Sequence, residues 1–95
     1  MTLTWSDRAI RQLTEIVAYI SAENVEAARR VAERIVSLAE TLLPEQPLIG
    51  RPGRVQGTRE LVVTQTPYVL AYHIKSNEIT VVAVIHAARR WPSSL

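Results

Sequence analysis

Residues 67–86 read PYVLAYHIKSNEITVVAVIH, two runs of β-forming residues separated by Ser76 and Asn77. Branched and aromatic side chains favour strands, and a Ser-Asn pair suits the tight turn between two antiparallel strands. The stretch therefore predicts a hairpin with strands at residues 68–75 and 79–86. This hairpin decides the fold, because it provides the surface on which the other elements must pack.

Successive side chains of a strand point to opposite faces, so each strand of the hairpin carries two sets of side chains. The first strand places Tyr68, Leu70, Tyr72 and Ile74 opposite Val69, Ala71 and His73. The second strand places Ile79, Val81, Ala83 and Ile85 opposite Thr80, Val82, Val84 and His86. One face is wholly apolar and should receive helices. The other carries valines, so we expect a partner or a second copy of the chain to cover it, as a hetero-oligomer or a homodimer.

Two amphipathic helices are predicted before the hairpin. Apolar residues recur at spacings of three and four from Ala9 to Ile20, after Ser6, whose hydroxyl can cap a helix start. A second stripe follows Asn24 and ends before Pro44. Helices joined by so few residues pack as an antiparallel pair.

The remaining segments are short. Residues 3–5 predict an edge strand, and residues 58–64 predict a third strand of the sheet. Between the helices and that strand, residues 48–57 hold all three glycines of the chain among prolines and arginines, which predicts a flexible basic loop. The prediction is an α+β fold of one domain, residues 1–95, in which a helix hairpin packs on one face of a small antiparallel sheet, followed by a basic C-terminal tail.

Charge is divided unevenly along the chain. Residues 1–49 hold five arginines and seven acids, whereas residues 50–95 hold five arginines and one lysine against two acids. The second half is therefore the part to which an anionic partner would be steered.

Composition excludes several classes of protein. There is no cysteine, so disulfides and thiolate metal sites are excluded, which suits a reducing cytoplasm. The N-terminus lacks the layout of a signal peptide, and no apolar run approaches the ~20 residues of a membrane helix. Two histidines without a metal-binding spacing make a poor metal site, so we expect neither metal nor cofactor.

Several short stretches together resemble the RelE/ParE superfamily of toxins from bacterial type II toxin–antitoxin pairs. These are AYI at 18–20, PLIGRPG at 47–53, GTREL at 57–61, PYVLAYHI at 67–74 and IHAARRWP at 85–92. The order and spacing resemble the ParE branch more closely than the RelE branch. The resemblance implies an antitoxin partner that lies across the toxin and neutralises it.

The resemblance leaves three functions open. ParE-like members inhibit DNA gyrase and so block replication, without being hydrolases. RelE-like members cut messenger RNA on the ribosome. A third class keeps the toxin fold but acts only with its antitoxin, in transcriptional autoregulation.

Tyr68 bears on the choice between the first two functions. RelE-like ribonucleases resemble one another in placing an arginine at the start of the middle strand, and Tyr68 stands at or next to that place. A tyrosine carries no positive charge at neutral pH, so the cation expected to face the scissile phosphate is missing. If the chain is a ribonuclease, His86 is the candidate acid or base and Arg59 a candidate cation.

A target-binding set follows from charge and from the resemblance: Arg51, Arg54, Arg59, Tyr68, His86, Arg89 and Arg90. The loop arginines and His86 also have structural alternatives. Exposed loop arginines keep a protein soluble, and a histidine at a strand end commonly bonds a backbone carbonyl. Trp91 is expected to fold back over the open end of the core, and Glu60 to pair with a helix arginine or with the antitoxin.

Overall fold

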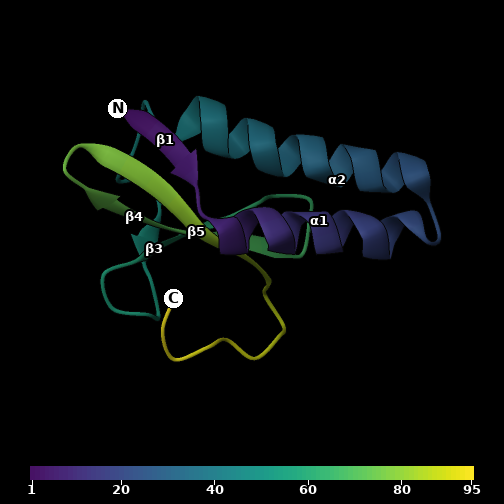
Figure 1. Cartoon of the computed structure of the whole chain (residues 1–95). Coiled ribbons are helices and arrows are strands. Elements are labelled where there is room, and N and C mark those ends of the chain that lie inside the picture. Colours follow the sequence, from purple (N-terminus) through teal and green to yellow (C-terminus); the bar gives the residue numbers. More distant parts are fainter.

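The computed structural model describes residues 1–95 (Figure 1). The elements in chain order are β1 (Thr2–Trp5), α1 (Asp7–Ser21), α2 (Val25–Ser37), the π-helical turn η1 (Leu38–Leu42), β2 (Arg51–Pro52), β3 (Arg59–Val62), β4 (Tyr68–Lys75) and β5 (Glu78–His86). The helix pair covers one face of a five-stranded sheet, so the predicted α+β arrangement is confirmed. Neither main helix has the length and apolar character required to cross a membrane.

Both helices begin at the predicted caps. The Ser6 hydroxyl accepts a hydrogen bond from the Ala9 N–H at 3.1 Å, and the Asn24 side chain accepts one from the Ala27 N–H at 2.9 Å. Each bond satisfies an amide that the first turn of a helix leaves without a partner.

The sheet has the order β1-β5-β4-β3-β2. The predicted purely antiparallel sheet is wrong at one edge, because β1 pairs with β5 in parallel. Parallel neighbours need a long connection, and here the whole helix pair and three strands lie between them. At the other edge, β2 pairs with β3 inside the segment predicted to be a loop. A strand of two residues leaves no periodic pattern in the sequence.

A β-bulge in β5 alters which residues face the helices. Ala71 is opposite Ala83, whereas the next residue, Tyr72, is opposite Val81, so β5 has one extra residue at Val82. A bulge of one residue reverses the alternation beyond it. The predicted grouping of Ala83 and Ile85 with Val81 is therefore wrong.

The bulge is held by the start of α1. The Ser6 hydroxyl donates to the Val82 carbonyl oxygen at 3.2 Å, and the Val84 N–H donates to the Gln12 side-chain oxygen at 2.8 Å. Side chains of α1 thus take up backbone groups that the disrupted strand pairing would leave unpaired.

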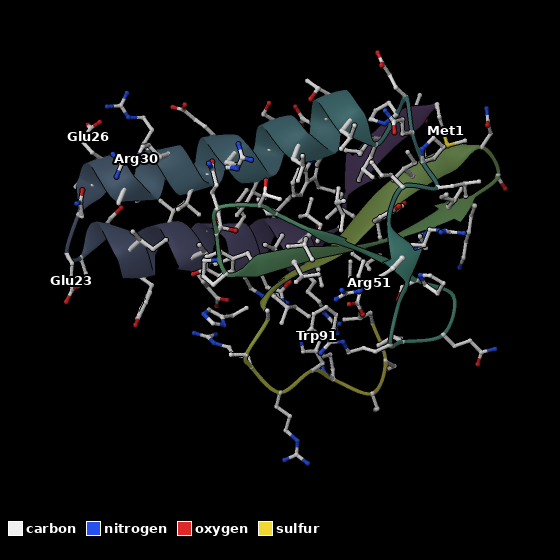
Figure 2. All side chains as sticks on the ribbon, turned by 180° about the vertical axis from the view of Figure 1, so that it is seen from behind. Met1, Glu23, Glu26, Arg30, Arg51 and Trp91 are labelled. Carbon is white, nitrogen blue, oxygen red and sulfur yellow. The ribbon has the colours of Figure 1, made fainter.

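The sheet separates two apolar clusters. The inner cluster, between sheet and helices, contains Ala9, Ile35, Ala39, Leu43, Val63, Tyr68, Leu70, Tyr72, Ile79, Val81 and Val84. The outer cluster contains Ala71, Val82, Ala83 and Ile85, with Trp91 and Leu95 of the C-terminal tail (residues 87–95) packed against it. The tail returns along the side of the sheet away from the helices (Figures 1 and 2). Trp91 does fold back as predicted, but onto the outer face, which the chain covers with its own tail.

Candidate functional site

The seven predicted target-binding residues fall into two separate groups. Arg51, Arg54 and Arg59 lie at the β2–β3 edge of the sheet. The other four, Tyr68, His86, Arg89 and Arg90, line one cavity at the ends of β4 and β5. The two groups make different contacts within the protein.

Glu60 organises the first group. It is 3% exposed, and its carboxylate accepts hydrogen bonds from the Arg51 side chain at 3.1 Å and from the Arg54 backbone N–H at 2.8 Å and side chain at 3.2 Å. Burial by itself raises the pKa of Glu60, but the bonds from Arg54 and Arg51 and the charge of Arg54 outweigh it and hold the pKa below its ordinary 4.5. The expected pairing of Glu60 with a helix arginine is wrong, because its partners are the neighbouring loop arginines.

The Arg59 side chain is also hydrogen-bonded within the protein. Its guanidinium donates to the Gly50 carbonyl oxygen at 2.7 Å and to the Leu48 carbonyl oxygen at 3.3 Å. Beside it, the Tyr72 hydroxyl donates to the Pro47 carbonyl oxygen at 2.7 Å and accepts from the Gly50 N–H at 2.9 Å. A Cβ at Gly50 would lie 2.6 Å from the Tyr72 hydroxyl oxygen, so this glycine is required by close approach. The segment predicted to be a flexible loop is thus tied to the sheet.

Arg54 connects this group to the tail. Its guanidinium carbon lies 3.8 Å from the centre of a Trp91 ring, a cation–π contact. Figure 2 shows Trp91 on the same side of the sheet as Arg51. The stack of Trp91 on Arg54, with Arg54 bonded to Glu60, is called the clasp below. It fixes where the tail crosses the outer face.

The second group lines a cavity of about 500 Å³. Its walls come from one side of α1, from the ends of β4 and β5 and from the tail. From α1 it receives Gln12, Glu15, Ile16 and Tyr19, which are spaced three, one and three residues apart and so share a side of the helix. A volume of this size is typical of sites for small organic ligands.

Tyr68 and His86 form the sheet wall of the cavity. Their rings meet edge to face, with centres 5.5 Å apart and planes at 83°. His86 Nδ1 accepts a hydrogen bond from the Ala88 N–H at 3.1 Å. The expected bond from His86 to a backbone carbonyl is therefore wrong. Because a neutral imidazole has one N–H, this bond leaves Nε2 as the donor of the ring.

The charged groups of the cavity have no partners within the protein. Arg89 and Arg90 are exposed and form no ion pair, and neither does Glu15; the three ion pairs of the molecule involve Glu26 and Glu60. The two guanidinium groups outweigh the single carboxylate, so the cavity favours an anion.

Four lining residues on α1 were not predicted as site residues: Gln12, Glu15, Ile16 and Tyr19. Their helical spacing was visible in the sequence, but a polar helix side is usually only solvated. What selects this side is the packing of α1 on β5, where the Gln12 side chain accepts a hydrogen bond from the Val84 N–H. No three His, Asp or Glu side chains gather in a group that could hold a metal ion.

Comparison with known proteins gives a consistent result. Residues 3–91 match the family model described as ParE toxin of type II toxin-antitoxin system, parDE. Toxin Y4kP of Sinorhizobium fredii is 43% identical over 93 residues, which is 98% of this chain and 95% of the relative. Toxin RelE2 of Caulobacter vibrioides is 38% identical over 87 residues, covering 92% of this chain and 96% of that toxin.

Solved structures share the fold. A chain of the chromosomal ParDE toxin–antitoxin system from P. aeruginosa superimposes with a TM-score of 0.75 at 25% identity, over 90% of this chain and 95% of that one. A chain of the toxin–antitoxin complex RelBE2 from Mycobacterium tuberculosis gives a TM-score of 0.69 at 24% identity, over 93% and 92% of the two chains.

Proposed function

The chain belongs to the ParE toxin family of type II toxin–antitoxin systems, and from this premise we propose that it inhibits DNA gyrase in the cytoplasm and is neutralised by a cognate antitoxin. The family model that matches is that of ParE, and a ParDE structure shares the fold over nearly the whole chain. These matches support a replication toxin.

The proposal rests mainly on which arginines around the sheet are bonded within the protein and which are free. Tyr68, and not a cation, begins β4 and is 7% exposed against His86. Arg51, Arg54 and Arg59 are bonded within the protein. The free cations near the cavity are thus Arg89 and Arg90 of the tail, which supports binding to an anionic surface more than strand cleavage on the sheet.

An antitoxin partner is supported by two findings. The solved relatives carry the names of toxin–antitoxin systems. This chain also exposes large apolar residues that nothing in the molecule covers: Met1, Ile10, Tyr19, Val25, Leu48, Ile49 and Val62. Side chains of this kind are what a partner would bury.

A supercoiling assay with purified gyrase tests the proposal. The wild-type chain should inhibit supercoiling, and the Arg89→Ala/Arg90→Ala variant should inhibit much less, while Arg30→Ala, which removes an exposed arginine on α2, should behave as wild type. Induced expression should lower DNA synthesis before protein synthesis. Full supercoiling at high toxin excess would overturn the proposal.

A second function, ribosome-dependent cleavage of messenger RNA, is favoured by one observation. Glu15, His86 and the two tail arginines line the same cavity. A carboxylate, an imidazole and guanidinium groups are the set that transfer of a phosphoryl group to a 2′-hydroxyl requires. Cut message on programmed ribosomes, abolished by His86→Ala, would establish this function in place of the first.

A further inference from the structure

We propose that the cavity between α1, the strand ends and the tail binds a single guanine nucleotide of an unpaired nucleic-acid segment. The inference rests on the cavity, which the second function would use as its active site, and it is tested without gyrase or ribosomes. Its volume of about 500 Å³ is in the range of sites that enclose one small ligand. Three parts of the lining correspond to the phosphate, the face of the base and the pairing edge of the base.

The phosphate is bound at the tail. Arg89 and Arg90 line the cavity, and neither has a carboxylate partner. His86 adds a donor, because its Nδ1 is occupied by the Ala88 N–H and its Nε2 then carries the hydrogen. Guanidinium groups bind phosphate with paired, charge-assisted hydrogen bonds.

The base stacks on α1. The Tyr19 side chain is 73% exposed and lies at the cavity, although a large aromatic side chain on a helix is ordinarily buried. An exposed ring beside a cationic patch is the usual arrangement by which proteins hold unpaired bases.

Gln12 and Glu15 select the base. The Gln12 side-chain oxygen is bonded to the Val84 N–H, so its amide nitrogen is left to donate. Glu15, one turn further along α1, can only accept. Guanine is the base whose pairing edge offers a carbonyl acceptor next to two N–H donors. Adenine and cytosine would direct a ring nitrogen lone pair at the carboxylate, and thymine and uracil would direct a carbonyl at it.

Nucleotide binding is measured directly by titrating the chain with the four 2′-deoxynucleoside 5′-monophosphates, and with guanosine 5′-monophosphate, while following backbone amide shifts. The guanine nucleotides should bind several-fold more tightly than the others and should shift amides of α1, the end of β5 and residues 87–95. A comparison of the deoxyribonucleotide and the ribonucleotide of guanine shows whether the cavity prefers DNA or RNA. The measurement needs no gyrase, so its result is separate from that of the supercoiling assay.

Substitutions can separate the contributions of phosphate binding, base stacking and base selection to nucleotide affinity. Arg89→Ala/Arg90→Ala should weaken binding of all four nucleotides by about tenfold or more, and Tyr19→Ala by roughly tenfold. Glu15→Gln should remove the preference for guanine. Arg30→Ala and Glu23→Gln, at exposed positions outside the cavity and toward the far end of the helix pair in Figure 2, should leave affinity and preference unchanged.

Two results would overturn the inference. One is equal affinity for the four nucleotides, or no shift at the cavity with any of them. The other is a Glu15→Gln variant that keeps the preference for guanine. Neither result can be attributed to misfolding, because Glu15 and Tyr19 are exposed and their substitution should not unfold the protein.

Discussion

The two faces of the sheet are stabilised in different ways. The inner face packs large side chains, among them Leu70, Tyr72 and Ile79, against two helices. The outer face has small residues such as Ala71 and Ala83 under a tail that the clasp holds. Stability therefore resides mainly on the inner face, because hydrophobic burial there is continuous and close-packed. On the outer face only a few contacts hold the tail against the sheet: the packing of Trp91 and Leu95, and the stack of Trp91 on Arg54.

The cavity lies where the two faces meet. One wall, α1, belongs to the rigid inner layer, and another wall, with Arg89 and Arg90, belongs to the tail. Substitutions in the tail should therefore affect folding much less than substitutions in the inner layer. The three predictions below test this difference in stability between the two faces, from the largest effect to the smallest.

Leu70→Ala should lower the free energy of unfolding by about 2–5 kcal/mol, because it opens a hole in the inner cluster, where Leu70 is fully buried. Val62→Ala, at a position 45% exposed, is the matched control and should cost less than about 0.5 kcal/mol. Chemical denaturation measures both. A loss below about 1 kcal/mol for Leu70→Ala would contradict the assignment of stability to the inner face.

Glu60→Gln should cost about 1–3 kcal/mol at neutral pH, because it weakens the charge-assisted bonds to Arg51 and Arg54 within the sheet edge. The pKa of Glu60 is lower in the folded than in the unfolded chain, so its contribution is complete above the ordinary value of 4.5 and is lost as the pH falls through the folded pKa.

The pH dependence provides the control for this prediction. Denaturation curves from pH 7 downward should show the gap between wild type and Glu60→Gln closing below pH 4.5. A gap that stays constant to pH 2 would mean that the carboxylate charge does not contribute to stability.

Trp91→Ala should cost only about 0.5–1 kcal/mol, since it removes one cation–π contact and a contact of the tail with small side chains. It should nevertheless increase the binding of a hydrophobic dye and speed amide exchange in residues 87–95, because the outer cluster loses its cover. Unchanged exchange in the tail would show that the clasp does not hold it.

Local patterns predicted much of the fold. The caps at Ser6 and Asn24 and the hairpin of β4 and β5 were correct, because each depends on residues close in sequence. The parallel β1 edge, the short β2 and the bulge at Val82 were missed. Each of these is set by pairing between distant segments, which periodicity does not record.

The seven target-binding residues were assigned as one set, and their role in target binding stays a prediction. The structure divides the set, because only Tyr68, His86, Arg89 and Arg90 line the cavity. Arg51, Arg54 and Arg59 were assigned to target binding because they are basic, but each is bonded within the chain. A sequence shows which side chains are charged, whereas the partner of each charge, such as Glu60, depends on the register of the sheet.

The pairing of β1 with β5 determines how early during synthesis the sheet can finish folding. Thr4 and Thr80, whose hydroxyl oxygens lie 3.4 Å apart, are 76 positions apart in the chain. A ribosome adds about 5–20 residues per second, so roughly 4–15 s separate the synthesis of these two strands. The backbone groups to which the Ser6 end of α1 attaches, on Val81 and Val82, are made late as well. The sheet, and the cavity lined by α1, β4, β5 and the tail, therefore cannot be completed until translation has passed β5.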